Sequence, residues 1–273
     1  MLSLLMLMLM GCLPKQTLHH NNLERDYFVH VPKELPADAP LVFFLHGYKG
    51  NARIYSLVGM KKQADELGFV VAFPQGTETS EGKTYWNAQL TIGDTDDIGY
   101  LSELAAHLQG ELGLDPTRTY ATGISNGGFM SYTLACQAPE VFHGVGSVIG
   151  TMSGETWQTC PEASVPIFQL SGTEDDVVPI DGSMDPENGW GGAPEMTSVI
   201  ERWAKVNGCT ETVSVDVDDQ GATTGTRHTG CESGAEVLYF EVDGMGHELP
   251  KWGWQAELSR FLMTLPAPQP AND

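Results

Sequence analysis

The stretch Thr119-Tyr-Ala-Thr-Gly-Ile-Ser-Asn-Gly-Gly128 decides the fold of this chain. Residues 119–124 predict a buried strand, and residues 126–138 predict a helix. The turn between them has the pattern Gly-x-Ser-x-Gly, with Ser125 at its centre. Glycine suits a turn that is too tight for side chains, so the serine hydroxyl would stand above the edge of a sheet. The pattern predicts a nucleophilic serine, and the alternative is a glycine-rich turn whose serine only caps the helix.

Short apolar runs alternate with segments of helical periodicity on both sides of this stretch. Such alternation predicts an α/β fold with a mainly parallel sheet and helices on both of its faces. No internal repeat or linker divides the chain, and 273 residues suit one large domain. We expect strands at 26–31 (an edge strand), 40–46, 68–74, 119–124, 142–149, 167–171 and 237–242, helices at 53–67, 96–112, 126–138, 196–207 and 254–264, and a surface loop at 181–194.

A serine hydroxyl needs a base and an orienting carboxylate, which should follow in the order Ser, Asp or Glu, His. His247 lies in a loop of small residues after the last expected strand, and we predict that it is the base. His228 lies in a polar Thr/Gly segment and is interpreted as a solvated loop residue. Asp175 follows the strand at 167–171 and is the preferred acid, with Asp176 or Glu174 as alternatives.

Stabilising the oxyanion requires two backbone N–H groups. We expect one from Asn126, the residue after the serine. The other should come from the loop Leu45-His-Gly-Tyr-Lys-Gly-Asn51, where Tyr48 is the expected donor. His46 in that loop is interpreted as a structural hydrogen-bonding residue rather than a base. The predicted chemistry requires no metal and no organic cofactor.

The charge of the chain excludes some partners. With 14 Lys and Arg against 36 Asp and Glu, the formal net charge is -22. A nucleic-acid partner needs basic side chains to replace its counterions, so nucleic acid is not expected. The same acidity disfavours adsorption to anionic lipid. We interpret it as a solvated exterior.

The first residues predict export. Residues 1–10 are almost wholly Leu and Met, a run that is too short to span a bilayer, and residues 1–11 are interpreted as a signal peptide. Leu9-Met-Gly-Cys12 is similar to a bacterial lipobox, which would make Cys12 a lipidated N-terminus; ordinary secretion is the alternative. We expect an extracytoplasmic protein that contacts a membrane only through this anchor. Residues 12–24 are expected to be a tether, 25–265 the catalytic domain and 266–273 a flexible tail.

Four cysteines remain after Cys12. An even number in an exported chain favours disulfides. Four cysteines allow three pairings, of which the sequence-local one is Cys136–Cys160 with Cys209–Cys231. Buried free thiols are the alternative. The spacing does not suggest a zinc site, because there is no Cys-x-x-Cys pair.

Several separated motifs resemble one known family, the exported polyhydroxybutyrate depolymerases and feruloyl esterases of the α/β-hydrolase fold. The resemblance covers about 25–265 and implies Ser125 as nucleophile, Asp175 as acid and His247 as base, and it supports disulfides involving Cys136 and Cys209. The motifs are Leu45-His-Gly-Tyr-Lys-Gly, Phe73-Pro-Gln-Gly76, Trp86-Asn-Ala88, Asp96-Asp-Ile-Gly99, Asp115 to Gly128, Leu134-Ala-Cys136, Gly172 to Pro179, Trp203 with Asn207-Gly-Cys209, and Gly244-Met-Gly-His247.

Two departures from this family concern the substrate. Ser171-Gly-Thr stands where such proteins often have His-Gly-Thr, and Leu249 stands where they often have Trp before Pro. We expect Trp252, or the nearby Trp254, to supply the missing aromatic wall and Trp86 to line the substrate site, although a lone Trp is more often a core residue.

The sequence therefore predicts an exported serine esterase that hydrolyses carboxylic esters through Ser125, His247 and Asp175. Because no accessory domain is visible and the charge is acidic, we favour feruloyl or acetyl esters on plant polysaccharide. The alternative substrate is a polyester such as polyhydroxybutyrate. A peptidase and an inactive ligand-binding lipoprotein are less favoured alternatives.

Overall fold

The computed structural model describes residues 13–217 and 222–266. The predicted signal peptide, the predicted lipidation of Cys12 and the tail from residue 267 onward lie outside the described residues. No helix of the described part is long and apolar enough to cross a membrane.

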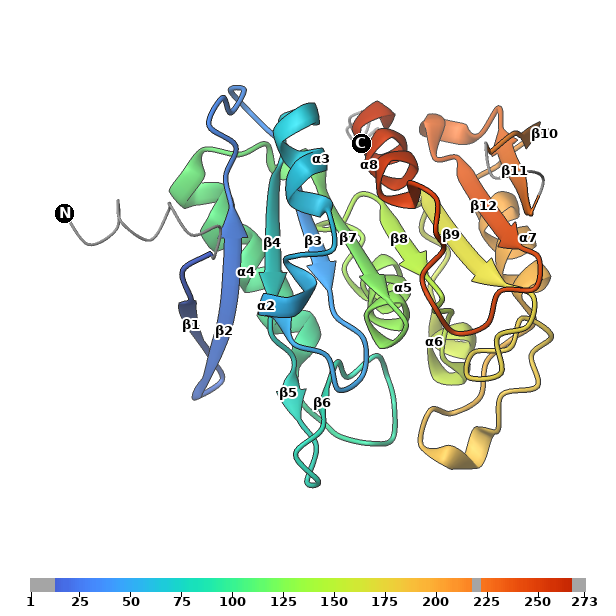
Figure 1. Cartoon of the computed structure of the whole chain (residues 1–273), viewed down its shortest axis with the longest axis horizontal. Helices are drawn as coiled ribbons and strands as arrows, with labels where there is room; N and C mark the ends of the chain where they lie inside the picture. Colours follow the sequence, from blue (N-terminus) through green and yellow to red (C-terminus); the bar gives the residue numbers. More distant parts are fainter. Residues whose placement is uncertain (1–12, 218–221, 267–273) are drawn as a thin grey trace.

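One ten-stranded sheet organises the described chain, in the order β1-β2-β4-β3-β7-β8-β9-β12-β11-β10 (Figure 1). The strands from β4 to β12 in this order run parallel, and two antiparallel strands extend each edge. The predicted α/β-hydrolase arrangement, a mainly parallel sheet between helices, is confirmed. The strands are β1 (Gln16–His20), β2 (Leu23–His30), β3 (Leu41–Leu45), β4 (Val70–Pro74), β7 (Thr119–Ile124), β8 (Val145–Val148), β9 (Ile167–Gly172), β10 (Glu211–Val215), β11 (Thr223–Thr229) and β12 (Val237–Val242), and a separate hairpin joins β5 (Thr77–Glu78) and β6 (Thr84–Tyr85).

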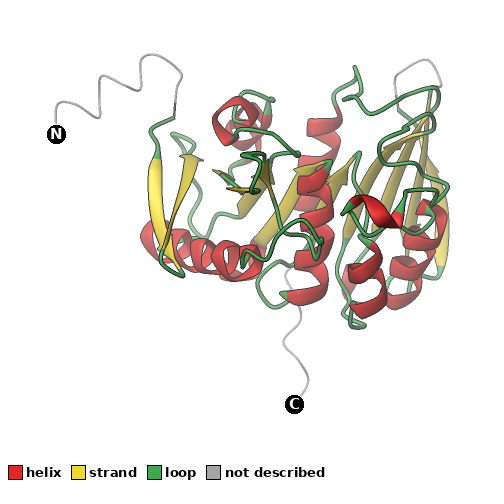
Figure 2. Cartoon of the chain, turned by 90° about the horizontal axis from the view of Figure 1, so that it is seen from below, coloured by secondary structure: helices red, strands yellow, loops and turns green. Residues whose placement is uncertain are grey.

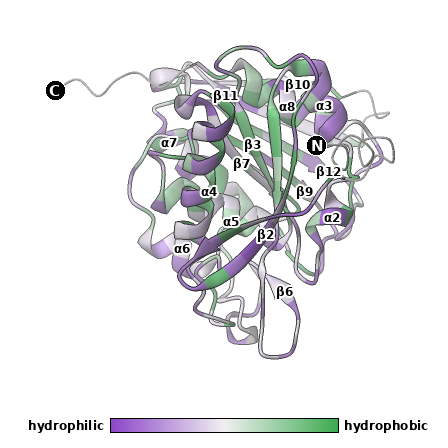
Figure 3. Cartoon of the chain, turned by 90° about the vertical axis from the view of Figure 1, so that its left-hand side faces the viewer, coloured by the Kyte–Doolittle hydropathy of each residue, from purple (hydrophilic) through white to green (hydrophobic). Residues whose placement is uncertain are grey.

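The core consists of two apolar layers, one on each face of the sheet. Alternate side chains of β3 show this division, because Phe43 contributes to one layer and Phe44 to the other. Every residue of β3 is buried, as expected for a parallel strand that is covered on both faces. Figures 2 and 3 show the two helical layers and the hydrophobic colour concentrated on the strands between them.

The helices α4, α5, α6 and α7 cover one face, and α2, α3 and α8 cover the other (Figure 1). The α4 helix begins where Asp96 accepts a hydrogen bond from the Gly99 amide at 2.8 Å, and it ends at Gly113, whose φ is 65°. The helices are α2 (Ala52–Tyr55), α3 (Met60–Leu67), α4 (Asp97–Leu112), α5 (Asn126–Gln137), α6 (Gly154–Thr159), α7 (Met196–Val206) and α8 (Trp254–Thr264), with 3-10 turns η2 (Pro116–Arg118), η3 (Pro186–Asn188) and η4 (Glu232–Gly234).

The single helix expected over 53–67 is wrong. The chain forms two short helices there, and α3 starts after Gly59, whose φ of 96° is incompatible with a continuous right-handed helix. Periodicity alone does not detect such a break, because apolar residues continue through it.

The edges of the sheet also differ from expectation. Residues 12–24 were expected to form a tether, but residues 16–20 form β1, which pairs with β2. As a result β2 is not the edge strand predicted over 26–31. At the opposite edge His228 lies in β11 rather than in a loop. These segments are polar because an edge strand is half exposed, and polar strands lack the apolar run that marks a buried strand.

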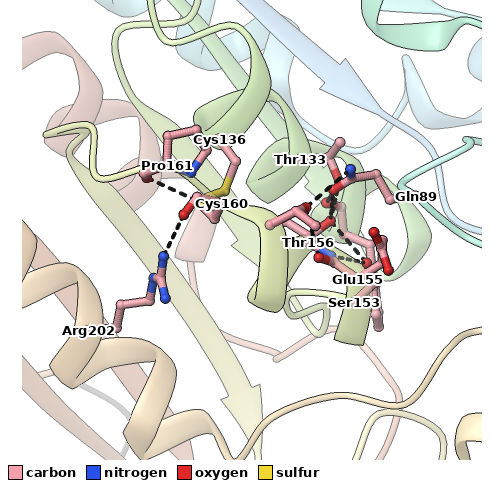
Figure 4. The surroundings of a disulfide bond; sticks show 11 residues. Gln89, Thr133, Cys136, Ser153, Glu155, Thr156, Cys160, Pro161 and Arg202 are labelled. Atoms are coloured by element: carbon pink, nitrogen blue, oxygen red, sulfur yellow. Dashed lines mark hydrogen bonds between the residues drawn. A yellow bond between two sulfur atoms is a disulfide. The ribbon is translucent and has the colours of Figure 1, made fainter.

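Two disulfides join Cys136 to Cys160 and Cys209 to Cys231, which confirms the sequence-local pairing. The first bond ties the end of α5 to the end of α6 (Figure 4). Arg202 of α7 donates a hydrogen bond to the Cys160 carbonyl at 2.8 Å, so three helices meet at this point. The second bond connects the end of α7 with the turn that follows β11.

Candidate active site

Ser125 occupies a strained turn between β7 and α5. Its φ of 52° is uncommon for a residue with a side chain. A Cβ at Gly123 would lie 2.3 Å from the carbonyl carbon of Gly127, and one at Gly127 would lie 2.3 Å from the Leu45 carbonyl oxygen. Both positions therefore require glycine. The serine side chain makes no capping hydrogen bond to α5, which contradicts the alternative that it only caps the helix.

The structure brings Ser125, His247 and Asp175 together from three loops at the same edge of the sheet. Nε2 of His247 lies 2.9 Å from Oγ of Ser125, and Nδ1 lies 2.7 Å from Oδ2 of Asp175. A carboxylate beside Nδ1 favours the tautomer that carries its proton there, which leaves Nε2 free to accept the serine proton.

Two backbone amides fix the carboxylate of Asp175. Its second oxygen accepts hydrogen bonds from the backbone amides of Val177 at 2.9 Å and Val178 at 2.7 Å, and its side chain is 1% exposed. Glu174 and Asp176, the alternatives of the sequence analysis, are exposed residues on either side of it. The loop therefore turns only Asp175 toward the imidazole.

His46 is buried behind the serine and has a structural role. Its Nδ1 donates to the Gly47 carbonyl at 2.8 Å, and its Nε2 accepts from the Gly76 amide at 2.9 Å. Burial lowers the pKa of this imidazole to about 4, so the ring is neutral near pH 7. A neutral ring with one donor and one acceptor matches these two backbone partners, and the Gln75 side chain also donates to Nε2 at 2.9 Å.

The two residues expected to bind the oxyanion flank Ser125. Asn126 begins α5, and its buried side-chain amide exchanges hydrogen bonds with the backbone of Trp86, at 2.7 and 3.0 Å. Tyr48 lies in the loop after β3, and its ring meets the ring of Trp190 edge-on at 5.4 Å. That loop passes close to the serine, because a Cβ on Gly47 would lie 3.5 Å from the Cβ of Ser125.

The predicted substrate contact of Trp86 is wrong, and Trp252 does not line the pocket beside Ser125. Trp86 is fully buried, and its indole donates to the His46 carbonyl at 3.0 Å. It supports the loop after β3 and faces no solvent. Trp252 packs edge-on against Phe240 at 5.4 Å in the second apolar layer. Sequence position placed both near the site, but the direction of each side chain depends on tertiary packing.

A pocket of about 250 Å³ opens in front of Ser125. Apolar and polar groups line it in similar measure, with Glu248 as the acidic group. Ile149 and Tyr55 belong to it and carried no signal in the sequence, because nothing local marks a residue as lining a pocket. The lining residues are Gly47, Tyr48, Tyr55, Ile124, Ser125, Ile149, His247, Glu248 and Leu249. Within 13–217 and 222–266, no group of three or more His, Cys, Asp or Glu side chains is arranged to hold a metal ion.

A buried ion pair between β2 and α4 supports the site. Arg25 of β2 donates to Asp97 of α4 at 2.5 Å, and both side chains are buried. The other oxygen of Asp97 accepts from the Asn87 amide at 2.7 Å, next to Trp86. Burial raises the pKa of Asp97, and the adjacent Arg25 opposes this shift. The N-cap of α4 is Asp96, so Asp97 is free to pair with Arg25.

Residues 27–207 match the family model described as esterase PHB depolymerase. Poly(3-hydroxyalkanoate) depolymerase C of Paucimonas lemoignei is 31% identical over 45% of this chain, and the match spans 30% of that protein's length. Feruloyl esterase C of Emericella nidulans is 27% identical, with 82% of this chain and 76% of the relative covered.

Among solved structures, an acetyl xylan esterase from Aspergillus awamori superposes with a TM-score of 0.68 at 14% identity. The superposition covers 92% of this chain and all of that one, and at this identity it shows the shared fold. The family model covers well over half of the chain. The chain therefore belongs to the esterase PHB depolymerase family of carboxylic ester hydrolases, built on the α/β-hydrolase fold.

Proposed function

We propose that this protein is a serine esterase in which Ser125 is the nucleophile, His247 the general base and Asp175 the residue that orients the imidazole. The observation that carries the proposal is the continuous hydrogen-bonded chain from Ser125 Oγ through the imidazole to Asp175 Oδ2. The strained serine turn supports it, because strain of this kind concentrates at functional sites.

In the proposed reaction Oγ of Ser125 attacks the ester carbonyl carbon while Nε2 of His247 takes the hydroxyl proton. The imidazolium then gives this proton to the leaving alcohol, and an acyl-enzyme remains. Water, activated by the same imidazole, attacks the acyl-enzyme and releases the acid. The backbone amides of Asn126 and Tyr48 are the proposed oxyanion donors, each contributing roughly 3 kcal/mol to lowering the barrier.

For the substrate we favour feruloyl or acetyl esters of plant polysaccharide. Relatives and neighbours named for these activities support the choice, as does the pocket of about 250 Å³ beside the serine. A polyester is the second candidate. It is favoured by the depolymerase relative and by the exposed side chains of Ile54 and Leu57, which flank the pocket residue Tyr55.

The decisive experiment compares the purified protein with its Ser125→Ala variant. Hydrolysis of p-nitrophenyl acetate and labelling by a fluorophosphonate should both disappear in the variant, while its thermal unfolding stays unchanged. Turnover that persists in the variant would overturn the assignment. Methyl ferulate, acetylated xylan and hydroxybutyrate oligomers, compared by kcat/KM, then separate the two substrate classes.

We also propose that the protein is exported and that lipid is attached at Cys12. The two disulfides support an oxidising compartment. Fractionation of bacterial cells expressing the full chain should recover it from the membrane fraction, and the Cys12→Ala variant should lose this association. Equal fractionation of both proteins would rule out the anchor without bearing on the esterase proposal.

A further inference from the structure

Ile149 lies next to Ser125 in a backbone conformation that a β-branched residue rarely adopts. It follows β8, its φ is 47°, and its side chain forms part of the pocket wall. A branched Cβ crowds its own backbone in the left-handed region, so the conformation is strained. It persists because the surrounding structure fixes it.

Hydrogen bonds on both sides of the Ile149–Gly150 peptide hold this conformation. The Ile149 amide donates to the Leu170 carbonyl at 2.8 Å. The Gly150 carbonyl accepts from Nε2 of Gln169 at 2.9 Å. The backbone here also lies directly behind the nucleophile, because a Cβ on Gly150 would lie 2.5 Å from the Ser125 carbonyl oxygen.

Gln169 is itself fixed by a buried network. The residue is fully buried in β9. Its Oε1 accepts from the Tyr132 hydroxyl of α5 at 3.0 Å, and its Nε2 also donates to Oγ of Ser171 at 2.8 Å. The amide therefore connects the helix behind Ser125 with the strand that leads to Asp175. The oxygen and nitrogen of the Gln169 side-chain amide cannot be interchanged, because the Tyr132 hydroxyl donates to the oxygen and the Gly150 carbonyl needs an N–H donor.

We propose that Ile149 determines the size of the substrate group admitted beside Ser125, and that Gln169 is the positioning residue that keeps Ile149 in this conformation. The proposal rests on the proposed esterase function and deepens it by naming the wall that sets selectivity. A relaxed backbone at residue 149 would swing its side chain away from the pocket. Gln169 would thus affect selectivity indirectly, because its side chain binds the backbone carbonyl of Gly150 and not the side chain of Ile149.

The first test measures selectivity in Ile149→Ala. One series of p-nitrophenyl esters varies the acyl group from two to eight carbons, and one series of alkyl acetates varies the alcohol group over the same range. In one series the ratio of kcat/KM for long over short esters should rise about tenfold or more, because one methylene in a fitted pocket changes specificity by about 10–200-fold. Ile200→Ala is the matched control, because Ile200 of α7 is buried to the same extent as Ile149 and does not line the pocket.

Unchanged ratios in both series would overturn the role of Ile149, even if every rate fell by the same factor. Failure of the esterase proposal itself looks different, since the unsubstituted protein would then hydrolyse none of the esters. The two failures are therefore distinguishable in one set of assays.

The second test is a double-mutant cycle on kcat/KM for the preferred ester. Gln169→Leu should lower it at least tenfold in the natural background and less than about threefold in the Ile149→Gly background, because glycine adopts the left-handed conformation without help. Gln169→Glu, which keeps an acceptor for Tyr132 and loses the N–H donors, serves if the leucine variant does not fold. An equal loss in both backgrounds would show that Gln169 does not act through residue 149.

Discussion

Two histidines at the same edge of the sheet have opposite environments. His46 follows β3 and is fully buried between the Gly47 carbonyl and the Gly76 amide. His247 follows β12, with its side chain 20% exposed between a carboxylate and a serine hydroxyl. Partners, not residue type, separate them: two backbone groups fix a neutral ring, whereas Asp175 can stabilise the positive charge that a general base acquires.

The largest expected effect comes from His247→Ala. It should lower kcat for p-nitrophenyl acetate by about 10⁶, because the serine loses its proton acceptor. The side chain is 20% exposed and lies in the pocket wall, so urea unfolding should show a change of under about 1 kcal/mol. A variant retaining a tenth of the activity would mean that the two histidines do not differ in the way their partners indicate.

Asp175→Asn should come next, with kcat reduced by about 10⁴, because an amide no longer favours the tautomer with its proton on Nδ1. The adjacent Asp176→Asn is the control, since that residue is exposed and should stay within about twofold. Similar losses in both variants would indicate a general effect of acidic charge in the loop rather than a specific contact.

His46 should be detected in the pH dependence of stability. Its pKa in the folded protein is about 4, below the ordinary value of 6.5. Between these values the unfolded chain binds a proton that the folded one does not, so stability is complete above pH 6.5 and is lost on acidification toward pH 4. The loss should amount to about 3 kcal/mol.

Urea unfolding of the natural protein and of His46→Gln across pH 4–7 measures this contribution. The variant should show a shallower decline on acidification, and the difference between the two curves isolates His46 from the other histidines. Parallel curves would argue that the ring is protonated in the folded state, which would break the contrast with His247.

The smallest effect is expected for Gln75→Leu. Gln75 donates to Nε2 of His46 at 2.9 Å and accepts from the Ala52 amide at 2.9 Å. Loss of these bonds should cost about 1–2 kcal/mol of unfolding free energy. Esterase activity should change less than threefold. A much larger loss of activity would indicate that His46 and Gln75 take part in the reaction rather than supporting the loop after β3.

Much of the central sheet was predictable, because buried parallel strands are short apolar runs. The limits predicted for β7, β12 and α8 agree with the structure, and α5 ends one residue before its predicted limit. The strands β1, β10 and β11 at the two ends of the sheet escaped prediction, since polar, half-exposed strands resemble loops. Both disulfides were predictable from chain proximity.

The candidate site, like the sheet, was predictable only in part. Ser125, Asp175 and His247 each follow a recognisable strand, so their order in the chain suggested that they meet. The expected direction of Trp86 was wrong. Ile149, Gln169 and Arg25 gave no signal, because no local sequence pattern specifies side-chain direction or long-range hydrogen bonds.

The sequence by itself determined the parallel sheet, the serine turn and the cysteine pairing, because apolar periodicity, glycine conformations and short loop closures act between residues that are near one another in the chain. Only the tertiary structure decided which carboxylate faces His247, which tryptophans are buried and how Ile149 forms the pocket wall. These features depend on contacts between segments that are far apart in sequence. Such contacts exist only after the sheet has brought its loops to one edge.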